Sequence, residues 1–209
     1  MNLLKHYIYL ALNENYSSLD EGFNFSKFKK IDDNQSMLTY ANLNLQEIGE
    51  GSSRKVYIFS GTKVLKVATC EAGLAQNETE VSIFTDPETA PIVAKIFDMD
   101  RHYFWLTSEL TRPLRTTVQF EKLAGLREKG QLDIDEFTFA ASRGMFEFIE
   151  SKYDEVRVMN FARSIHALVR KYGLLAGDLG KVDSWGVTPD GRLVLIDYGF
   201  SQTVKNRYY

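Results

Sequence analysis

The sequence changes character close to Arg112-Pro113. Before this point, short runs of branched and aromatic residues alternate with glycine turns, a pattern that predicts strands. After it, longer segments carry apolar residues at helical spacing and end near glycine, which predicts helices. A strand-rich half followed by a helical half, with no long linker between them, favours an α+β fold with two lobes.

The first half is expected to form an antiparallel sheet with one main helix. The predicted strands are residues 43–48, 56–59, 63–68, 92–98 and 102–108. The last two are expected to pair around a turn at residues 99–101. The helix is predicted at Glu71–Thr85, where Asp86-Pro87 closes it.

The second half is expected to contain three helices and a hairpin. The predicted helices are residues 116–129, 135–151 and 153–172, with Asp133 or Asp135 as the cap of the second and Gly173 ending the third. Pro189-Asp190-Gly191 predicts the turn between strands 186–188 and 192–196. Core packing is the expected role of four phenylalanines: Phe137, Phe139, Phe146 and Phe148.

Composition narrows the classes of function. A net charge of -3 with 25% charged residues provides no basic field for nucleic acid or an anionic membrane. The single cysteine, Cys70, cannot form an intrachain disulfide, which fits a reducing cytoplasm. Residues 3–11 follow helical spacing and predict a core-facing amphipathic helix rather than a membrane anchor. The three histidines are isolated from one another, so neither a zinc site nor a catalytic triad is expected.

Two glycines separate the first two predicted strands. Gly49-Glu50-Gly51 would let the backbone approach a phosphate without a side-chain clash, although such a pair is more often only a hairpin turn. Val56 follows at the spacing of a residue that covers a nucleotide base. Arg54 stands where a third glycine would complete the pattern.

A lysine and a glutamate follow in the next two elements. Lys66 lies among apolar neighbours on the third strand, where its ammonium could reach phosphates. On the helix, Glu80 lies on the same side as Asn77 and is our choice to pair with Lys66. Glu78 points to a different face and is the main competitor, while Glu71 lies close to the helix start.

Two further acidic segments complete the candidate site. Asp178 opens a loop after the third helix and is the candidate general base, and Lys181 is placed to offset its charge or to contact a transferring phosphoryl group. Asp197 follows a fully apolar strand and precedes Tyr198-Gly199. That context is typical of a carboxylate that holds magnesium.

Taken in this order, the residues resemble the protein-kinase-like superfamily across residues 43–200, and most of all the short kinases that some phages and bacteria encode. The resemblance implies a bilobal α+β fold and binding of ATP and Mg2+. Lys66 and Glu80 would position the phosphates. Asp197 would hold magnesium together with Asp183, which stands where protein kinases place an asparagine.

By the same resemblance, the backbone of residues 108–110, including Glu109 and Leu110, would bind adenine. The sequence continues for only ten residues after Gly199, without the activation segment or Ala-Pro-Glu element of protein kinases. We therefore expect a reduced C-lobe, with a protein acceptor held by residues 111–152 or by another subunit. The expected division is an N-terminal helical extension at 1–40, an N-lobe at 41–110 and a minimal C-lobe at 111–209.

The function expected from this resemblance is ATP-dependent phosphoryl transfer by a minimal Ser/Thr protein-kinase-like enzyme. Two alternatives stay open. One is a pseudokinase that keeps the fold for interaction, in a phage particle or against a host protein. The other is a small-molecule kinase of the aminoglycoside or choline type, whose loops are similar to Gly177-Asp178-Leu179 and to Ile196-Asp197-Tyr198-Gly199. The expected location is the cytoplasm, or the host cytoplasm or virion for a phage protein.

Overall fold

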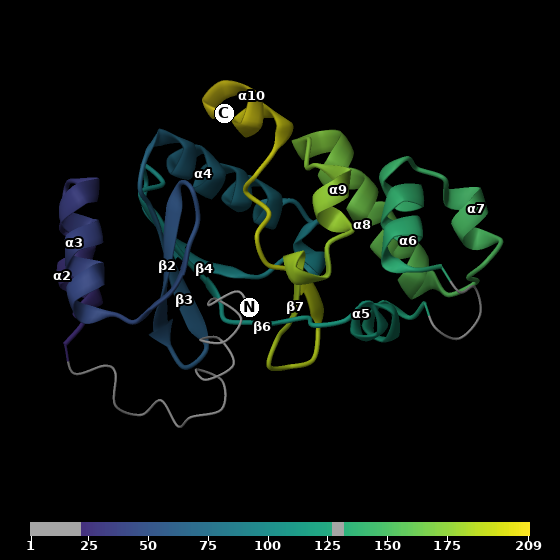
Figure 1. The fold of residues 1–209 in the computed structure, drawn as a ribbon, viewed down its shortest axis with the longest axis horizontal. Helices are drawn as coiled ribbons and strands as arrows, with labels where there is room; N and C mark the ends of the chain where they lie inside the picture. The colour runs from purple at the N-terminus through teal and green to yellow at the C-terminus, as the bar shows by residue number, and fades with distance from the viewer. Residues whose placement is uncertain (1–21, 127–131) are drawn as a thin grey trace.

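A computed structural model describes residues 22–126 and 132–209. The helix predicted within residues 3–11 and the end of the helix predicted at 116–129 lie outside the described residues. The described part of the chain forms two lobes, with a sheet in the first and mainly helices in the second (Figure 1). The predicted α+β class is therefore confirmed.

The first lobe is built on a five-stranded antiparallel sheet with the strand order β1-β2-β3-β5-β4. The strands are β1 (Glu47–Glu50), β2 (Arg54–Ser60), β3 (Lys63–Ala68), β4 (Ile96–Met99) and β5 (Trp105–Glu109). Val56 on β2 lies opposite Lys66 on β3. Directly opposed residues share a face of the sheet, so these two side chains point to the same side.

One long helix, α4 (Glu71–Thr85), packs against β3 and β5. It begins after the exposed Cys70 and has the bounds predicted from the sequence. Two shorter helices, α2 (Phe25–Phe28) and α3 (Asn34–Asn44), lie beyond the sheet at the far side from the second lobe (Figure 1). They contribute to a small aromatic core with Tyr57 and Trp105.

The second lobe combines helices with a small three-stranded sheet. The helices and 3-10 turns that follow Pro113 are α5 (Thr117–Ala124), α6 (Ile134–Ser142), α7 (Phe146–Glu150), α8 (Val156–Tyr172), α9 (Ala176–Leu179), η2 (Val182–Ser184) and α10 (Gln202–Tyr208). A further 3-10 turn, η1 (Ala90–Ile92), precedes β4. The small sheet contains β6 (Arg112–Pro113), β7 (Trp185–Val187) and β8 (Leu193–Leu195) in that order. After β8 the chain crosses back to the first lobe, where α10 packs against α4 (Figure 1).

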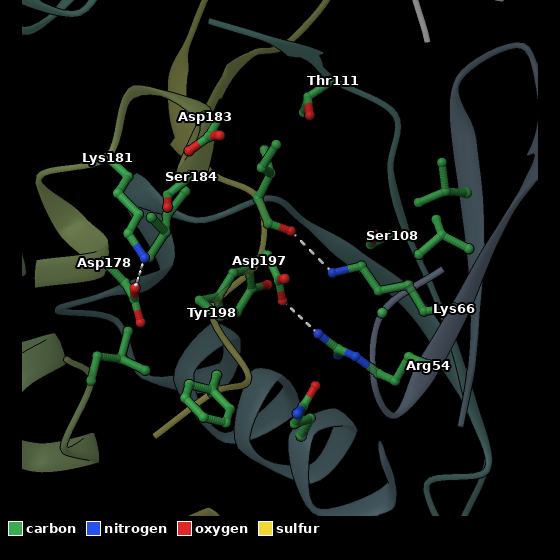
Figure 2. Close-up of a pocket in the computed structure, with 18 of the residues that line it drawn as sticks. Arg54, Lys66, Ser108, Thr111, Asp178, Lys181, Asp183, Ser184, Asp197 and Tyr198 are labelled. Carbon is green, nitrogen blue, oxygen red and sulfur yellow. Dashed lines mark hydrogen bonds and ion pairs between the residues drawn. The ribbon is translucent and has the colours of Figure 1, made fainter. Parts of the chain in front are cut away.

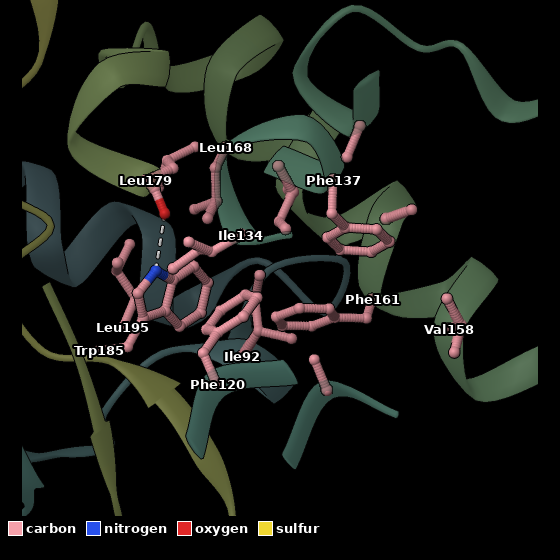
Figure 3. Packing of buried hydrophobic residues seen from close by; sticks show 14 of the residues in the cluster. Ile92, Phe120, Ile134, Phe137, Val158, Phe161, Leu168, Leu179, Trp185 and Leu195 are labelled. Carbon is pink, nitrogen blue, oxygen red and sulfur yellow. Dashed lines mark hydrogen bonds between the residues drawn. The ribbon is translucent and has the colours of Figure 1, made fainter. Parts of the chain in front are cut away.

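The larger core lies in the second lobe, where aromatic rings from α5, α6, α8 and β7 meet (Figure 3). The buried Trp185 ring makes an edge contact with Phe120 at 5.2 Å and a tilted contact with Phe161 at 5.5 Å between centroids. Its indole N–H donates a hydrogen bond of 2.8 Å to the Leu179 carbonyl oxygen. This bond ties α9, which carries Asp178, to the strand that begins at Trp185.

Three predictions about the elements are wrong in part. The strand predicted at residues 43–48 begins only at Glu47, because the chain up to Asn44 belongs to α3. The strand predicted at 92–98 begins at Ile96, after the 3-10 turn η1. The helix predicted at 135–151 is two helices, because the backbone takes a positive φ of 69° at Gly144, between α6 and α7.

The prediction that four phenylalanines pack in the core is correct for two of them. Phe137 is fully buried and Phe146 packs against the larger core. Phe139 and Phe148 are exposed, because they lie on the outer faces of α6 and α7 once the helix is divided. Of the two predicted caps, Asp133 and Asp135, the helix uses Asp133, whose carboxylate accepts from the Glu136 backbone N–H in a capping box.

Three further elements are shorter than predicted: α5 ends at Ala124, because Gly125 takes a positive φ of 84°, β5 begins at Trp105 and α8 begins at Val156. Other predictions are confirmed. β3 has the predicted bounds, β4 and β5 are antiparallel neighbours, and β7 and β8 form the predicted hairpin. The division at residues 40 and 110 stays a prediction, and α3 continues across residue 40. No helix in the described ranges is both long and apolar enough to cross a membrane.

Candidate active site

A cleft of about 540 Å³ lies between the sheet of the first lobe and the loops of the second. Its volume falls in the usual range for small-molecule sites. Nine residues predicted for the site line it: Gly51, Val56, Lys66, Glu109, Leu110, Asp178, Lys181, Asp183 and Asp197. The other two do not: Gly49 is paired with Val56 within the sheet, and Glu80 is fully buried behind Lys66.

The predicted pair between Lys66 and Glu80 is present. The Lys66 Nζ donates to both carboxylate oxygens of Glu80, at 2.9 and 2.8 Å, and to the Ile196 carbonyl oxygen at 3.0 Å. Both side chains are buried, so the pair is held with little competition from water. Glu78, the competitor on the same helix, is exposed. The pair therefore fixes the end of the lysine at the inner wall of the cleft.

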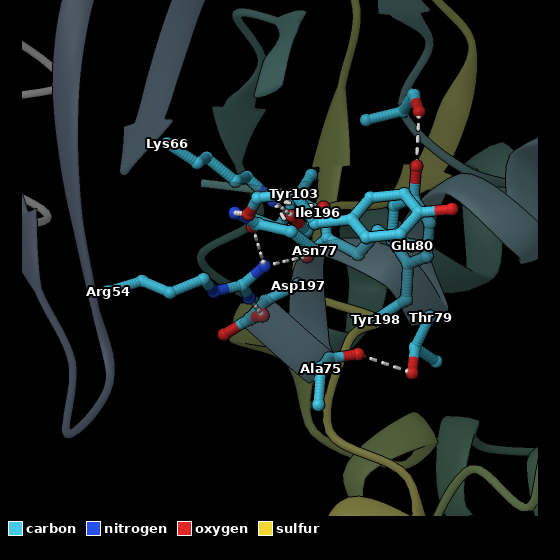
Figure 4. Close-up of polar contacts among 11 residues, drawn as sticks. Arg54, Lys66, Ala75, Asn77, Thr79, Glu80, Tyr103, Ile196, Asp197 and Tyr198 are labelled. Atoms are coloured by element: carbon cyan, nitrogen blue, oxygen red, sulfur yellow. Dashed lines mark hydrogen bonds and ion pairs between the residues drawn. The ribbon is translucent and has the colours of Figure 1, made fainter. Parts of the chain in front are cut away.

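Arg54 is the residue of this site that sequence reasoning missed. Its guanidinium donates from Nη1 to Glu80 Oε1 at 2.8 Å and to Asn77 Oδ1 at 3.2 Å, and from Nη2 to Asp197 Oδ1 at 2.6 Å (Figure 4). Only 7% of its side chain is exposed. The available signal was an arginine at a position where the pattern expects glycine, and that signal does not reveal where the side chain points.

The Asp197 carboxylate opens into the cleft, with 69% of its side chain exposed. Desolvation raises the pKa of this carboxyl, but the positive charges of Arg54 and Lys66 outweigh that effect and hold the pKa below its ordinary value. Asp197 is therefore ionised at neutral pH. Figure 2 shows Arg54 and Lys66 entering from the sheet side toward Asp197 and the neighbouring backbone.

The two residues after Asp197 hold it against the first lobe. The Tyr198 ring is buried, and its hydroxyl donates a hydrogen bond of 2.6 Å to the Ala94 carbonyl oxygen. Burial raises the pKa of that hydroxyl well above its ordinary value, so it stays a donor. A Cβ at Gly199 would lie 2.6 Å from the Gln76 carbonyl oxygen of α4, so only glycine permits this approach.

The opposite wall of the cleft carries Asp178, Lys181 and Asp183 (Figure 2). The Lys181 Nζ lies 2.5 Å from Asp178 Oδ1, and this contact raises the pKa of the lysine. Asp178 lies on the short helix α9, and Asp183 lies on the 3-10 turn that follows. The predicted charge partner of Asp178 is therefore in place, and both carboxylates face the space in front of Asp197.

The segment between the lobes forms the inner edge of the cleft. The backbone N–H of Glu109 donates to the Lys95 carbonyl, and that of Leu110 donates to the Thr62 carbonyl, each at 2.8 Å. The Glu109 carboxylate accepts two hydrogen bonds from one guanidinium nitrogen of Arg192, at 2.8 and 2.9 Å. The linker is thus joined to the hairpin of the second lobe, and its predicted contact with adenine stays a prediction.

The glycine loop is supported at its base. The Gly51 N–H donates to the Arg54 carbonyl at 2.9 Å, and the Thr69 N–H donates to the Ser53 carbonyl at 2.8 Å. At the tip, the Ser52 and Tyr209 hydroxyls lie 2.7 Å apart. The loop therefore contacts the segment that leads into α4 and the residue that follows α10.

The donor set suits magnesium better than a transition metal. Asp183 and Asp197 offer carboxylate oxygens, which Mg2+ prefers, and the ion commonly completes its shell with water and substrate phosphates. In the described part of the chain, no group of three or more His, Cys, Asp or Glu side chains is placed to hold a metal. Two carboxylates on facing parts of one cleft fit an ion that arrives with a phosphate ligand.

Comparisons with known proteins concern the fold. No family model and no curated protein matches the chain. Among solved structures, a streptomycin–ATP complex of the aminoglycoside phosphotransferase APH(2")-IIa matches with a TM-score of 0.40 and 11% identity, over 81% of this chain and 71% of that one. The ADP-bound aminoglycoside phosphotransferase APH(2'')-Ib gives 0.41 and 11% over the same shares.

The choline kinase LicA from Streptococcus pneumoniae matches with a TM-score of 0.32 and 14% identity, over 73% of this chain and 61% of that one. All three TM-scores lie below 0.5. At such low scores the likeness says nothing about the reaction or the substrate.

Proposed function

We propose that this protein is an ATP-dependent phosphotransferase that uses Mg2+. One observation supports this above all: the buried Lys66–Glu80 pair, the ionised Asp197 and the facing Asp178 are arranged around a single cleft. Phosphoryl transfer needs a cation for the phosphates, carboxylates for the metal and a carboxylate near the acceptor. Each requirement has a residue in this cleft.

The nucleotide end of the site is assigned to the first lobe. Lys66, held by Glu80, would bind the α- and β-phosphates, and Val56 on the same face of the sheet would cover the adenine. Gly51 leaves room for phosphates under the loop, and the linker at Glu109 and Leu110 would bind the base through its backbone. Asp183 and Asp197 would hold Mg2+, which supplies charge neutralisation to the phosphates when bound.

The acceptor end is assigned to Asp178 and Lys181. A hydroxyl oxygen of the acceptor forms the new bond to the γ-phosphorus, the bond between that phosphorus and the bridging oxygen breaks, and ADP leaves. Asp178 orients the hydroxyl and takes its proton, which passes to water because 38% of the side chain is exposed. The ammonium of Lys181 balances the negative charge of Asp178 until the phosphates of the nucleotide bind.

The acceptor is proposed as a Ser/Thr-type hydroxyl of a protein, with a small-molecule hydroxyl as the alternative. A second candidate function is nucleotide binding without transfer. The contact of Arg54 with Asp197 favours it, because a guanidinium already satisfies one oxygen of a proposed metal ligand. The location proposed for either function is the cytoplasm, where ATP and reduced thiols are found.

The proposal is tested by nucleotide binding and transfer measured on the same samples. Saturating Mg2+ and ATP should stabilise the protein by about 2.7 kcal/mol at a hundred times the dissociation constant. With ATP labelled in its γ-phosphate, the label should be transferred to a generic protein acceptor, an aminoglycoside, choline or water. Glu80→Gln should weaken binding at least tenfold, whereas Glu78→Gln, on the exposed face of the same helix, should not change it.

Asp178→Asn separates the two candidate functions. For a phosphotransferase, the variant binds Mg2+ and ATP as the wild type does and transfers at least a hundredfold more slowly. Binding with no transfer in the wild type would support the second function. Absence of any stabilisation by Mg2+ and ATP in the wild type would contradict both.

A further inference from the structure

Arg54 forms a charged contact across the cleft that the proposed reaction does not use. It is the first residue of β2, directly after the glycine loop, and its guanidinium reaches Asp197 at 2.6 Å and Glu80 at 2.8 Å (Figure 4). The first contact joins a strand of the first lobe to the segment that leaves the second lobe. Arg54 and Asp197 are 143 residues apart in the sequence.

The charge balance shows which contact depends on Arg54. Each carboxylate oxygen of Glu80 accepts a hydrogen bond from the Lys66 ammonium, so the charge of Glu80 is matched without Arg54. The Asp197 carboxylate, in contrast, accepts its side-chain hydrogen bond from Arg54, at 2.6 Å. The cluster as a whole holds two cations and two carboxylates.

A divalent cation on Asp197 would lie within a few ångströms of this guanidinium, where like charges repel strongly in a partly desolvated site. A triphosphate changes the balance, because it brings several acceptor oxygens and negative charges to which a guanidinium binds well. Arg54 follows Ser52 and Ser53 of the glycine loop, on the side of the cleft where the phosphates are proposed to bind.

We propose that Arg54 is a positioning residue that makes metal binding in this cleft depend on the nucleotide. In the nucleotide-free protein its guanidinium holds Asp197 and opposes the metal. When a nucleoside triphosphate enters, Arg54 exchanges Asp197 for phosphate oxygens and leaves the carboxylate to the metal. This inference rests on the proposed function, because it needs a nucleotide and a divalent cation in the same cleft.

The proposal is tested with Mn2+, a spectroscopic substitute for Mg2+. Binding of Mn2+ is measured by electron paramagnetic resonance with and without a nonhydrolysable ATP analogue. Arg54→Gln should bind Mn2+ without nucleotide at least tenfold more tightly than the wild type. With the analogue present, the difference should fall below threefold. Lys55→Gln is the matched control: it removes a positive charge from the next residue of β2, which pairs with Glu47 and Glu50. None of these three residues lines the cleft, so the variant should behave as the wild type.

A folded Arg54→Gln protein that binds Mn2+ no more tightly than the wild type would overturn the inference and leave the proposed function intact. Loss of Mn2+-dependent analogue binding in both proteins would overturn the proposed function and the inference with it. Should Arg54→Gln fail to fold, the wild type decides: the side-chain Nε–H resonance of Arg54 should shift when Mg2+ and the analogue are added, and not with the same concentration of Mg2+ alone. An unshifted resonance with the analogue bound would overturn the inference.

Discussion

At the scale of single residues, the cleft depends on side chains that hold backbone in place as much as on those that face the ligand. Tyr198 does this beside Asp197, because its buried hydroxyl donates to the Ala94 carbonyl at 2.6 Å. The Lys66 Nζ also lies 5.8 Å from the centroid of its ring, so Tyr198 is close to both Asp197 and Lys66. A phenylalanine there would keep the packing and lose the hydrogen bond.

Tyr198→Phe should lower the free energy of unfolding by about 1–3 kcal/mol, because the Ala94 carbonyl oxygen is left without this donor in a buried setting. Urea denaturation followed by circular dichroism measures the change. Tyr209→Phe is the control: it also removes a hydroxyl contact, to Ser52, but at an exposed position, and should stay within about 0.5 kcal/mol of the wild type. Equal losses in the two variants would contradict this account of Tyr198.

The sequence predicted the residues of the site whose neighbours are close in the chain. Glu80 could be chosen over Glu78 because helical spacing decides which face each occupies. Arg54 could not be assigned in this way, because its partners lie 26 and 143 residues away and no local pattern relates them. The loop position alone indicated only that a glycine was replaced.

At the scale of elements, α4 connects the glycine loop with the rest of the cleft. Gly73 lies in its first turn, directly under the loop, where an added Cβ would overlap the Ser53 carbonyl oxygen and lie 2.9 Å from the Ala68 Cβ. The close contact of helix and loop therefore requires a residue without a side chain. This places Arg54, the next residue after Ser53, at its present distance from α4.

Gly73→Ala should destabilise the protein by about 1–3 kcal/mol, because overlap with the loop outweighs the gain of about 1 kcal/mol that alanine brings to a helix. The variant should also bind the ATP analogue more weakly, since the loop must move. Thermal unfolding and calorimetric titration measure the two effects. Gly61→Ala, in a turn with open space around the added Cβ, should change neither, and a stabilised Gly73→Ala protein would refute the close contact.

Elements with strong end signals were predicted well. α4 is closed by Asp86-Pro87, and β3 follows a tight turn, so both have the expected bounds. The segment 135–151 carried an apolar pattern that continued through Gly144, and a helical pattern cannot reveal that one glycine adopts a positive φ. The same limit applies at Leu43, whose apolar character suggested a strand although its side chain is exposed on α3.

At the scale of the whole molecule, Asp86 joins the two lobes through contacts outside the lining of the cleft. Its Oδ2 accepts from Lys171 Nζ at 3.0 Å and from the Tyr172 hydroxyl at 2.9 Å, both on α8, and its Oδ1 accepts from the Glu88 N–H at 2.9 Å. The Glu88 N–H and the Lys171 ammonium hold the pKa of the Asp86 carboxyl below its ordinary value of 3.8. The end of α4 is thus attached to the longest helix of the second lobe.

Because the folded protein lowers this pKa, the ionised carboxylate stabilises the fold fully above about pH 3.8, and the contribution is lost as the pH falls through the lowered value. Asp86→Asn should therefore be less stable than the wild type at pH 7, and the difference should shrink toward zero below pH 3.8. Urea unfolding at a series of pH values measures it. Glu88→Gln, which removes a more exposed partner of Lys171, should show a smaller difference at pH 7. A pH-independent gap for Asp86→Asn would contradict the prediction.

The division into a sheet half and a helical half could be read from the sequence, because each half repeats its own apolar spacing. The contacts between the halves could not. They depend on how two finished lobes meet, and they join residues as distant as Glu109 and Arg192. The aromatic core with Trp185 at its centre likewise draws on segments from α5 to β7 that share no local pattern.

The single thiol of the chain, on the exposed Cys70 at the start of α4, offers a practical way to follow the cleft. A maleimide dye would attach at one position without any substitution of other cysteines, because the sequence contains only this one. The label would lie at the end of the helix that carries Glu80 and four residues after Lys66. Its fluorescence anisotropy would report in real time when the N-terminal end of α4 moves as ligands enter the cleft.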